Sequence, residues 1–125
     1  IKILITNWYE NKMKYNLTDI KKAYQNIGIK EGMIVVVKTD IRFLGPYESN
    51  DQNQLLRDHL DTLINLVNLE KGTIVVSTGT TSLCNTNNVF DINNTPSEMG
   101  SLTEFIRNHR NSVRSFHPFN SYAAI

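Results

Sequence analysis

Apolar residues recur along this chain with two different periods. In three stretches they follow the i, i+3, i+4, i+7 spacing of a helix that buries one side: 18–27, 55–67 and 102–109. Three shorter stretches are rich in β-branched or apolar residues, which is typical of strands: 33–37, 73–77 and 112–116. Because parallel strands need long crossover connections, this alternation predicts an α/β protein with a mostly parallel sheet and flanking helices.

The residues at the ends of these stretches predict where the elements begin and stop. Thr18 is expected to cap the first helix, and Gly28 to end it. Ser101 and Glu104 have the spacing of a capping box that opens the last helix. The run 33–37 is apolar at every position, which predicts a strand covered on both faces.

The length suggests one domain. The chain has 125 residues, about the size of one small domain. We therefore expect residues 1–125 to form a single α/β domain or the N-terminal portion of one, with 1–14 as a variable N-terminal segment. The sequence has no initiating methionine and stops at Ile125, so we expect both ends to be cut.

Charge and cysteine content narrow the classes of partner. Thirteen Lys and Arg residues against 12 Asp and Glu give a net charge of +1, so neither nucleic acid nor an anionic membrane surface is an expected partner. The longest apolar run is far shorter than the roughly 20 residues of a membrane span. The lone cysteine, Cys84, excludes an internal disulfide and fits a reducing, cytoplasmic setting. The sequence leaves open whether the protein forms a homodimer.

Polar residues follow each predicted strand, at 38–40, 78–82 and 117–118. In open α/β sheets, ligands bind just beyond the carboxyl ends of the strands. We therefore expect a crevice there, lined by hydroxyls, one cation, one carboxylate and one imidazole. The run 78–82 matches neither a Walker loop nor a GxGxxG motif.

Among the titratable groups, His117 is the main candidate for chemistry. It could act as a general base, or it could be a buried histidine satisfied by a backbone carbonyl. His59 lies in an apolar helical stripe and is expected to be a hydrogen-bonded core residue. Cys84 is either a thiolate nucleophile partnered by His117 or an inert loop cysteine. The three histidines lack the i, i+4 spacing of helical zinc sites, so no metal is expected.

Two segments carry a more specific signal. Residues 90–100 read F-D-I-N-N-T-P-S-E-M-G, and residues 114–124 read R-S-F-H-P-F-N-S-Y-A-A. Together, in this order and separation, they resemble the aminoglycoside 3-N-acetyltransferase family, whose patterns are F-D-x-x-x-T-P-S-x-M-G and R-S-x-H-P-x-x-S-x-x-A. Weaker agreement extends upstream, where 72–76 resembles the family's G-T-L-V strand.

The resemblance implies an enzyme that transfers an acetyl group from acetyl-CoA to an amine of an aminoglycoside or related amino sugar, as in antibiotic resistance. Its substrates would be small molecules, with acetyl-CoA as the co-substrate. The catalytic residue it suggests is His117. Asp91 and Glu98 are expected in the acceptor pocket, although Glu98 could equally cap a helix or lie on the surface. The residues expected to bind the cofactor are Lys38, Thr39, Thr78, Thr80 and Ser121.

The sequence departs from the family pattern in three ways. Lys38-Thr39-Asp40 stands where the family has His-Ser-Ser, and Ser77 stands where it has proline. The later N-x-S-x-H-x-x-E segment, which carries the family's catalytic His and Glu, does not occur in this sequence. The chain is therefore expected to be the N-terminal part of a longer enzyme or a shortened relative. The alternative function is a non-catalytic domain that binds a CoA-like ligand.

Overall fold

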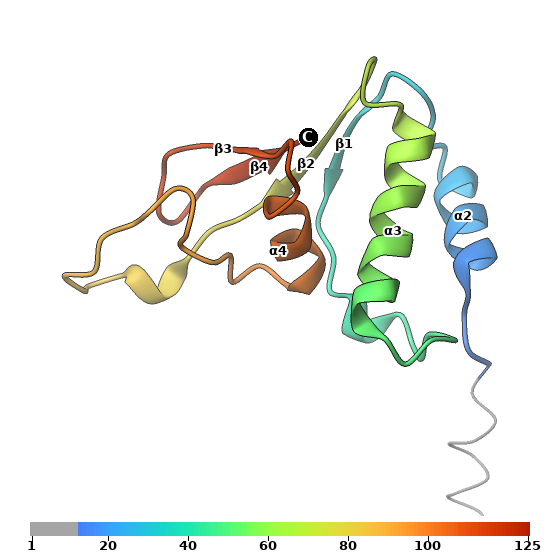
Figure 1. Ribbon diagram of the computed structural model, residues 1–125, viewed down its shortest axis with the longest axis horizontal. Coiled ribbons are helices and arrows are strands. Elements are labelled where there is room, and N and C mark those ends of the chain that lie inside the picture. The colour runs from blue at the N-terminus through green and yellow to red at the C-terminus, as the bar shows by residue number, and fades with distance from the viewer. Residues whose placement is uncertain (1–12) are drawn as a thin grey trace, which may run out of the picture.

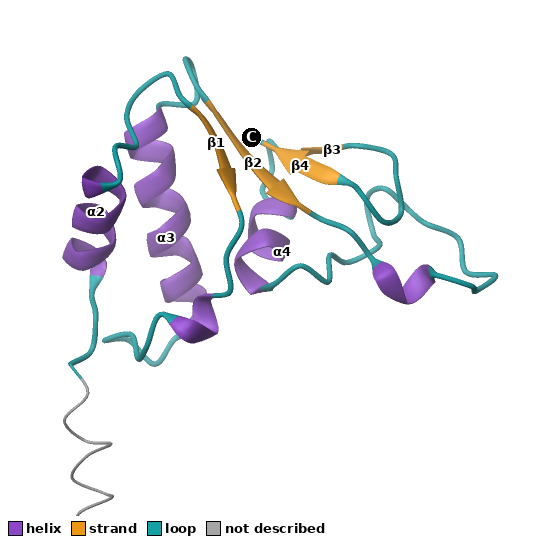
Figure 2. Cartoon of the chain, turned by 180° about the vertical axis from the view of Figure 1, so that it is seen from behind, coloured by secondary structure: helices purple, strands orange, loops and turns teal. Residues whose placement is uncertain are grey.

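A computed structural model describes residues 13–125 as one sheet whose helices gather on one of its faces (Figures 1 and 2). The elements are, in chain order, α2 (Leu17–Asn26), β1 (Ile34–Val37), the 3-10 helix η1 (Ile41–Phe43), α3 (Gln52–Val67), β2 (Thr73–Ser77), the 3-10 helix η2 (Thr81–Leu83), α4 (Ser101–Arg107), β3 (Val113–Arg114) and β4 (Tyr122–Ala124). Helices α3 and α4 pack on the sheet, and α2 packs on α3. The predicted segment 1–14 lies almost entirely outside the described residues.

The predicted α/β class with flanking helices is confirmed, but the sheet is mixed rather than mostly parallel. Its strand order is β1-β2-β4-β3, and only β1 and β2 are parallel. Strand β4, which the sequence pattern did not predict, lies between β2 and β3 and is antiparallel to both. The reason is the short connection 115–121 between β3 and β4, which can form a hairpin but not a crossover.

This arrangement keeps β2 and β3 pointing in the same direction, because each is antiparallel to β4. The carboxyl ends of both strands therefore meet at one edge of the sheet, where β4 also begins. The residues that follow β1, β2 and β3 are thus brought to the same end of the molecule, as the sequence predicted for a parallel sheet.

The core lies between the sheet and the helices α3 and α4. Ile74 and Val76 of β2 are fully buried in it, together with Leu63 of α3 and Ile106 of α4. Alternation along the strands leaves the opposite face open, since Val36 of β1 is 65% exposed. The expectation that 33–37 is covered on both faces is therefore wrong for the described residues. No helix among them is long and apolar enough to cross a membrane.

Two predicted helix starts are also corrected. The cap of α2 is Asn16, whose side-chain oxygen accepts hydrogen bonds from the N–H groups of Thr18 (2.8 Å) and Asp19 (3.2 Å). Thr18 is thus inside the helix. Helix α4 is preceded by Gly100, whose φ of 120° favours glycine. The capping box with Glu104 does not form, because this carboxylate instead accepts the N–H of Ser97 at 2.8 Å.

Candidate functional site at the carboxyl ends of the strands

Three loops converge beyond the end of β2. The N–H of Thr78 donates to the carbonyl of Ser121 (2.8 Å), and the N–H of Thr80 donates to that of Pro118 (2.9 Å). The N–H of Glu98 donates to the carbonyl of Gly79 (3.0 Å). These bonds join the loop after β2 to the β3–β4 hairpin and to the segment 95–100, so residues from both family-like segments meet at one place.

Gly79 allows this close approach. A Cβ atom at this position would lie 2.2 Å from the carbonyl oxygen of Phe119, a backbone atom that cannot move aside. The glycine in the run 78–82 therefore serves contact between two loops.

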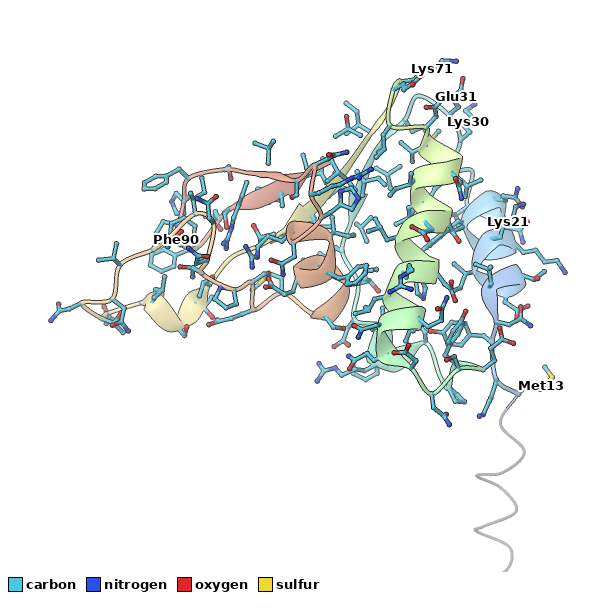
Figure 3. All side chains as sticks on the ribbon, viewed as in Figure 1. Met13, Lys21, Lys30, Glu31, Lys71 and Phe90 are labelled. Carbon is cyan, nitrogen blue, oxygen red and sulfur yellow. The ribbon has the colours of Figure 1, made fainter. Side chains whose placement is uncertain are left out.

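Arg114 of β3 connects these loops, although it is not among the site residues predicted from the sequence. Its guanidinium donates to the carbonyl oxygens of Thr95 and Thr78, each at 2.5 Å, and the side chain is buried. Its guanidinium carbon also lies 4.8 Å from the centre of the Phe90 ring, and Phe90 lies among the loops beyond β2 and β3 (Figure 3). The sequence did contain one signal for Arg114, because it is the first residue of the R-S-x-H-P motif and the only charged residue of its strand.

Three of the four hydroxyl residues predicted to bind the cofactor are buried here, and the fourth, Thr39, lies at the end of β1. Thr78 and Ser121 are fully buried, and their hydroxyl oxygens lie 3.0 Å apart. Ser121 Oγ also donates to the Thr78 carbonyl at 2.9 Å, and Arg114 Nε donates to both hydroxyl oxygens. Thr80 Oγ1 donates to the carbonyl of Pro96 at 2.6 Å. In this structure all three hydroxyls hold loops together and offer no free surface to a ligand.

Glu98 is exposed, yet its carboxylate is strongly held. It accepts hydrogen bonds from Thr81 N (2.8 Å), Thr81 Oγ1 (2.7 Å) and Ser82 N (3.1 Å) at the start of η2. Hydrogen bonding from the side chains of Ser82 and Thr81, and then from their backbone N–H groups, lowers the pKa of Glu98 to about 2. The carboxylate is therefore ionised at neutral pH and fixed in direction.

Asp91 has a comparable role in its own loop. Its carboxylate accepts the N–H groups of Asn93 (2.8 Å) and Asn94 (3.0 Å) and the Asn94 amide (2.9 Å). Hydrogen bonding, first from the Asn94 side chain, lowers the pKa of Asp91.

A cleft of about 660 Å³ lies between the loop after β1 and the segment 98–101. Asp40 and Glu98 both line it, together with Arg42. Asp40 accepts hydrogen bonds from the Arg42 side chain (2.5 and 2.8 Å), which lower its pKa, and it also caps η1. With two carboxylates and one guanidinium, these three side chains give the cleft a net negative charge.

The other predicted residues do not line this cleft. Lys38 and Thr39, at the end of β1, line a neighbouring cavity instead. His117 is exposed on the β3–β4 hairpin, and Asp91 is in the loop before α4. The structure therefore brings Asp40 and Glu98 together, and holds His117 and Asp91 in adjacent loops.

His117 is neither buried nor bonded to a carbonyl through its ring. Its Nδ1 accepts the N–H groups of Phe119 (3.2 Å) and Asn120 (3.0 Å) and so stabilises the hairpin turn. In the neutral ring this leaves the proton on Nε2, which can donate a hydrogen bond. Cys84 is an exposed free thiol, and no hydrogen bond joins it to His117 in the described part of the chain. Residues 13–125 also contain no group of three side chains suited to a metal ion.

Comparison with solved structures finds the same fold in longer proteins. AAC-VIa with sisomicin bound matches with a TM-score of 0.71 and 21% identity, over 90% of this chain and 46% of that one. YokD from Bacillus subtilis matches with a TM-score of 0.73 and 22% identity, over 89% and 50% of the two chains. AAC-IIIb in a binary complex with CoASH gives 0.70 and 16%, over 90% and 46%. The chain thus spans about half the length of these relatives.

Fold and site together define an α/β chain with its candidate site at the carboxyl ends of the strands, built on two sequence segments that contact each other. The profile of the aminoglycoside 3-N-acetyltransferase family matches residues 36–125, which include both segments. The chain belongs to this family, and the resemblance found in the sequence is confirmed. No match was found among curated protein sequences.

Proposed function

We propose that this protein transfers the acetyl group of acetyl-CoA to an amine of an aminoglycoside or a related amino sugar. The observation that carries the proposal is the acidic cleft at the strand ends, formed by a segment that matches the family. Relatives with this fold include one with bound sisomicin and one with bound CoASH, which supports both substrate classes.

The cleft suits a cationic acceptor. Asp40 and Glu98 line it, and the pKa of each carboxyl is lowered, chiefly by hydrogen bonds from neighbouring side chains. Groups held in the ionised form attract an ammonium but are weak bases. We therefore assign Glu98 to binding the amino sugar, with Asp40, and not to removing its proton. Asp91 is assigned to the outer part of the acceptor site.

The acetyl donor is assigned to the end of β1 and the adjoining loops. Lys38 is exposed there and supplies a cation for the phosphates of CoA, with the Thr39 hydroxyl beside it. Thr78, Thr80 and Ser121 would support the donor site indirectly, because their hydroxyls fix the loops that surround it.

In the proposed reaction, the neutral amine attacks the thioester carbonyl, a C–N bond forms and the C–S bond breaks. The amine loses a proton, and CoA leaves as the thiol. Negative charge that develops on the carbonyl oxygen needs a hydrogen-bond donor. We assign that role to His117 Nε2, since its Nδ1 is already occupied by two backbone N–H groups.

The test is release of free thiol from acetyl-CoA, measured with sisomicin and with glucosamine as acceptors. We expect release that depends on both substrates. Glu98→Gln should raise the KM for the acceptor several-fold more than the KM for acetyl-CoA, whereas Glu48→Gln, at an exposed position outside the cleft, should change neither. Thiol release at background level with all aminoglycosides and simple amino sugars would refute the proposal.

A second function is favoured by one observation. Asp40 replaces a serine of the family pattern and is used here to cap η1 and to pair with Arg42, which places a carboxylate close to the expected phosphates. The loss of the serine hydroxyl would suit a domain without catalysis, and the pairing with Arg42 offsets the charge of Asp40 towards the phosphates of a CoA-like ligand. Calorimetry that detects acetyl-CoA binding, together with no thiol release, would support this alternative.

A further inference from the structure

A second cavity, of about 450 Å³, neighbours the acidic cleft and lies between α2, α3 and the edge strand β1. Ile20 and Ala23 of helix α2 and its C-cap Ile27 line this cavity, while Lys21 on the outer side of the helix points away from α3 (Figure 3). The volume is within the range of small-molecule sites, about 300–1,000 Å³. The apolar residues that line it include Ile20, Ala23, Ile29, Val35, Val37 and Leu63.

Three aromatic side chains with polar atoms, Tyr15, Tyr24 and His59, also line this cavity, as do Asp19, Lys38 and Thr39. His59 is 4% exposed, and its Nδ1 lies 2.8 Å from the hydroxyl of Tyr24. The rings of Tyr15 and Tyr24 meet the His59 ring edge-on, with centroids 6.2 and 5.9 Å away. This arrangement suits an aromatic body of similar size.

Two of these polar atoms have no partner. Within residues 13–125, neither His59 Nε2 nor the hydroxyl of Tyr15 makes a hydrogen bond, although both atoms are buried. Buried polar atoms are nearly always hydrogen-bonded, so each of the two calls for a partner. Both belong to residues that line the same cavity, which makes a single ligand able to satisfy them.

The chemistry of the two atoms defines the partner. Burial lowers the pKa of His59, so the ring is neutral at pH 7 and has one donor and one acceptor nitrogen. A hydroxyl group can both donate and accept, so it fits Nε2 in either tautomer and also fits the Tyr15 hydroxyl. His59 and Tyr15 themselves carry no charge at neutral pH, because burial lowers the pKa of His59 and raises that of Tyr15, so a charged group bonded to them would lose its hydration without gaining an ion pair from either.

We propose that this cavity binds a small uncharged aromatic molecule with one hydroxyl group, which bonds to His59 Nε2 and to the Tyr15 hydroxyl. Lys38 and Thr39, which the proposed function assigns to the acetyl donor, also line this cavity, but the inference does not depend on that function because it rests on the two buried atoms without partners. Its occupant is recognised by an apolar body and one polar group, the usual combination in small-molecule sites.

The experiment titrates the full 125-residue chain, labelled with ¹⁵N, with phenol and with benzene as the matched probe without a hydroxyl. We expect saturable shifts of the His59 ring nitrogens and of amides in α2 and α3, with tighter binding of phenol than of benzene. Tyr15→Phe should weaken phenol binding by up to about tenfold and leave benzene binding unchanged. Tyr122→Phe, which changes an exposed tyrosine on the opposite face of the sheet, is the matched control.

The outcomes are separable. Selective loss of phenol affinity in Tyr15→Phe supports the proposal. Equal affinities for phenol and benzene in the unchanged chain would overturn it, and so would the absence of saturable binding of either probe. Equal weakening by Tyr15→Phe and Tyr122→Phe would also overturn it, because the effect would not come from the cavity. None of these results depends on thiol release from acetyl-CoA.

Discussion

Replacing Arg114 by alanine should lower the free energy of unfolding by about 3 kcal/mol. The guanidinium donates to the carbonyls of Thr78 and Thr95, both at 2.5 Å, and only 8% of the residue is exposed. Hydrogen bonds from a charged group contribute about 1.5–3 kcal/mol each, so the loss of these two removes about 3–6 kcal/mol. The alanine variant no longer buries a charge that lacks a carboxylate partner, and this offsets part of the lost free energy. The net loss is therefore about 3 kcal/mol.

Arg114→Lys should recover at most about half of the loss, because one ammonium cannot reach both carbonyls in the fork geometry of a guanidinium. Urea unfolding of the 125-residue chain measures both variants. Arg110→Ala is the matched control, since Arg110 is exposed and no hydrogen bond of its side chain is found in residues 13–125. Equal stability of Arg114→Ala and Arg110→Ala, or full recovery by lysine, would show that the guanidinium does not tie the loops together.

Two further predictions concern Glu98 and the two faces of the sheet. The folded-state pKa of Glu98, about 2, is below its usual 4.5, so the stabilisation by the ionised carboxylate is complete above about pH 4.5 and is lost as the pH falls towards 2. Glu98→Gln should therefore flatten the acid part of a curve of unfolding free energy against pH, and an unchanged acid part would argue against the contacts with η2. Val76→Ala should lower the free energy of unfolding in urea by about 2 kcal/mol, because Val76 is fully buried. Val36→Ala should lower it by about 0.5 kcal/mol or less, because Val36 is 65% exposed, and equal losses would mean that both faces of the sheet are covered.

Most of the fold could be predicted from local patterns. The helical spacing of 55–67 corresponds to most of α3, and the run 73–77 coincides with β2. Strand β4 was missed because it has only three residues, too few to show a period. Because β4 was not predicted, the sheet was expected to be mostly parallel. In the structure β3 pairs with β4 in the antiparallel direction and does not pair with β2.

The candidate site was predictable in position but not in detail. Its place beyond the strand ends follows from the general behaviour of α/β sheets and from the family-like segments. The hydroxyls of Thr78 and Ser121 were expected to face a ligand, but they are buried against each other. Arg114 was overlooked because an arginine in a short strand gives no local sign that its side chain is buried.

The sequence by itself determined the α/β class, the helices and the two parallel strands, and the family, because these depend on neighbouring residues whose spacing can be read directly. The tertiary structure decided the strand order, the open face of the sheet and the contacts at the site. These depend on residues far apart in the chain, such as Thr78 and Ser121, which are separated by 43 positions. The packing of distant segments decides whether a hydroxyl or a guanidinium at the site faces a ligand or another loop. A local sequence pattern does not contain this information.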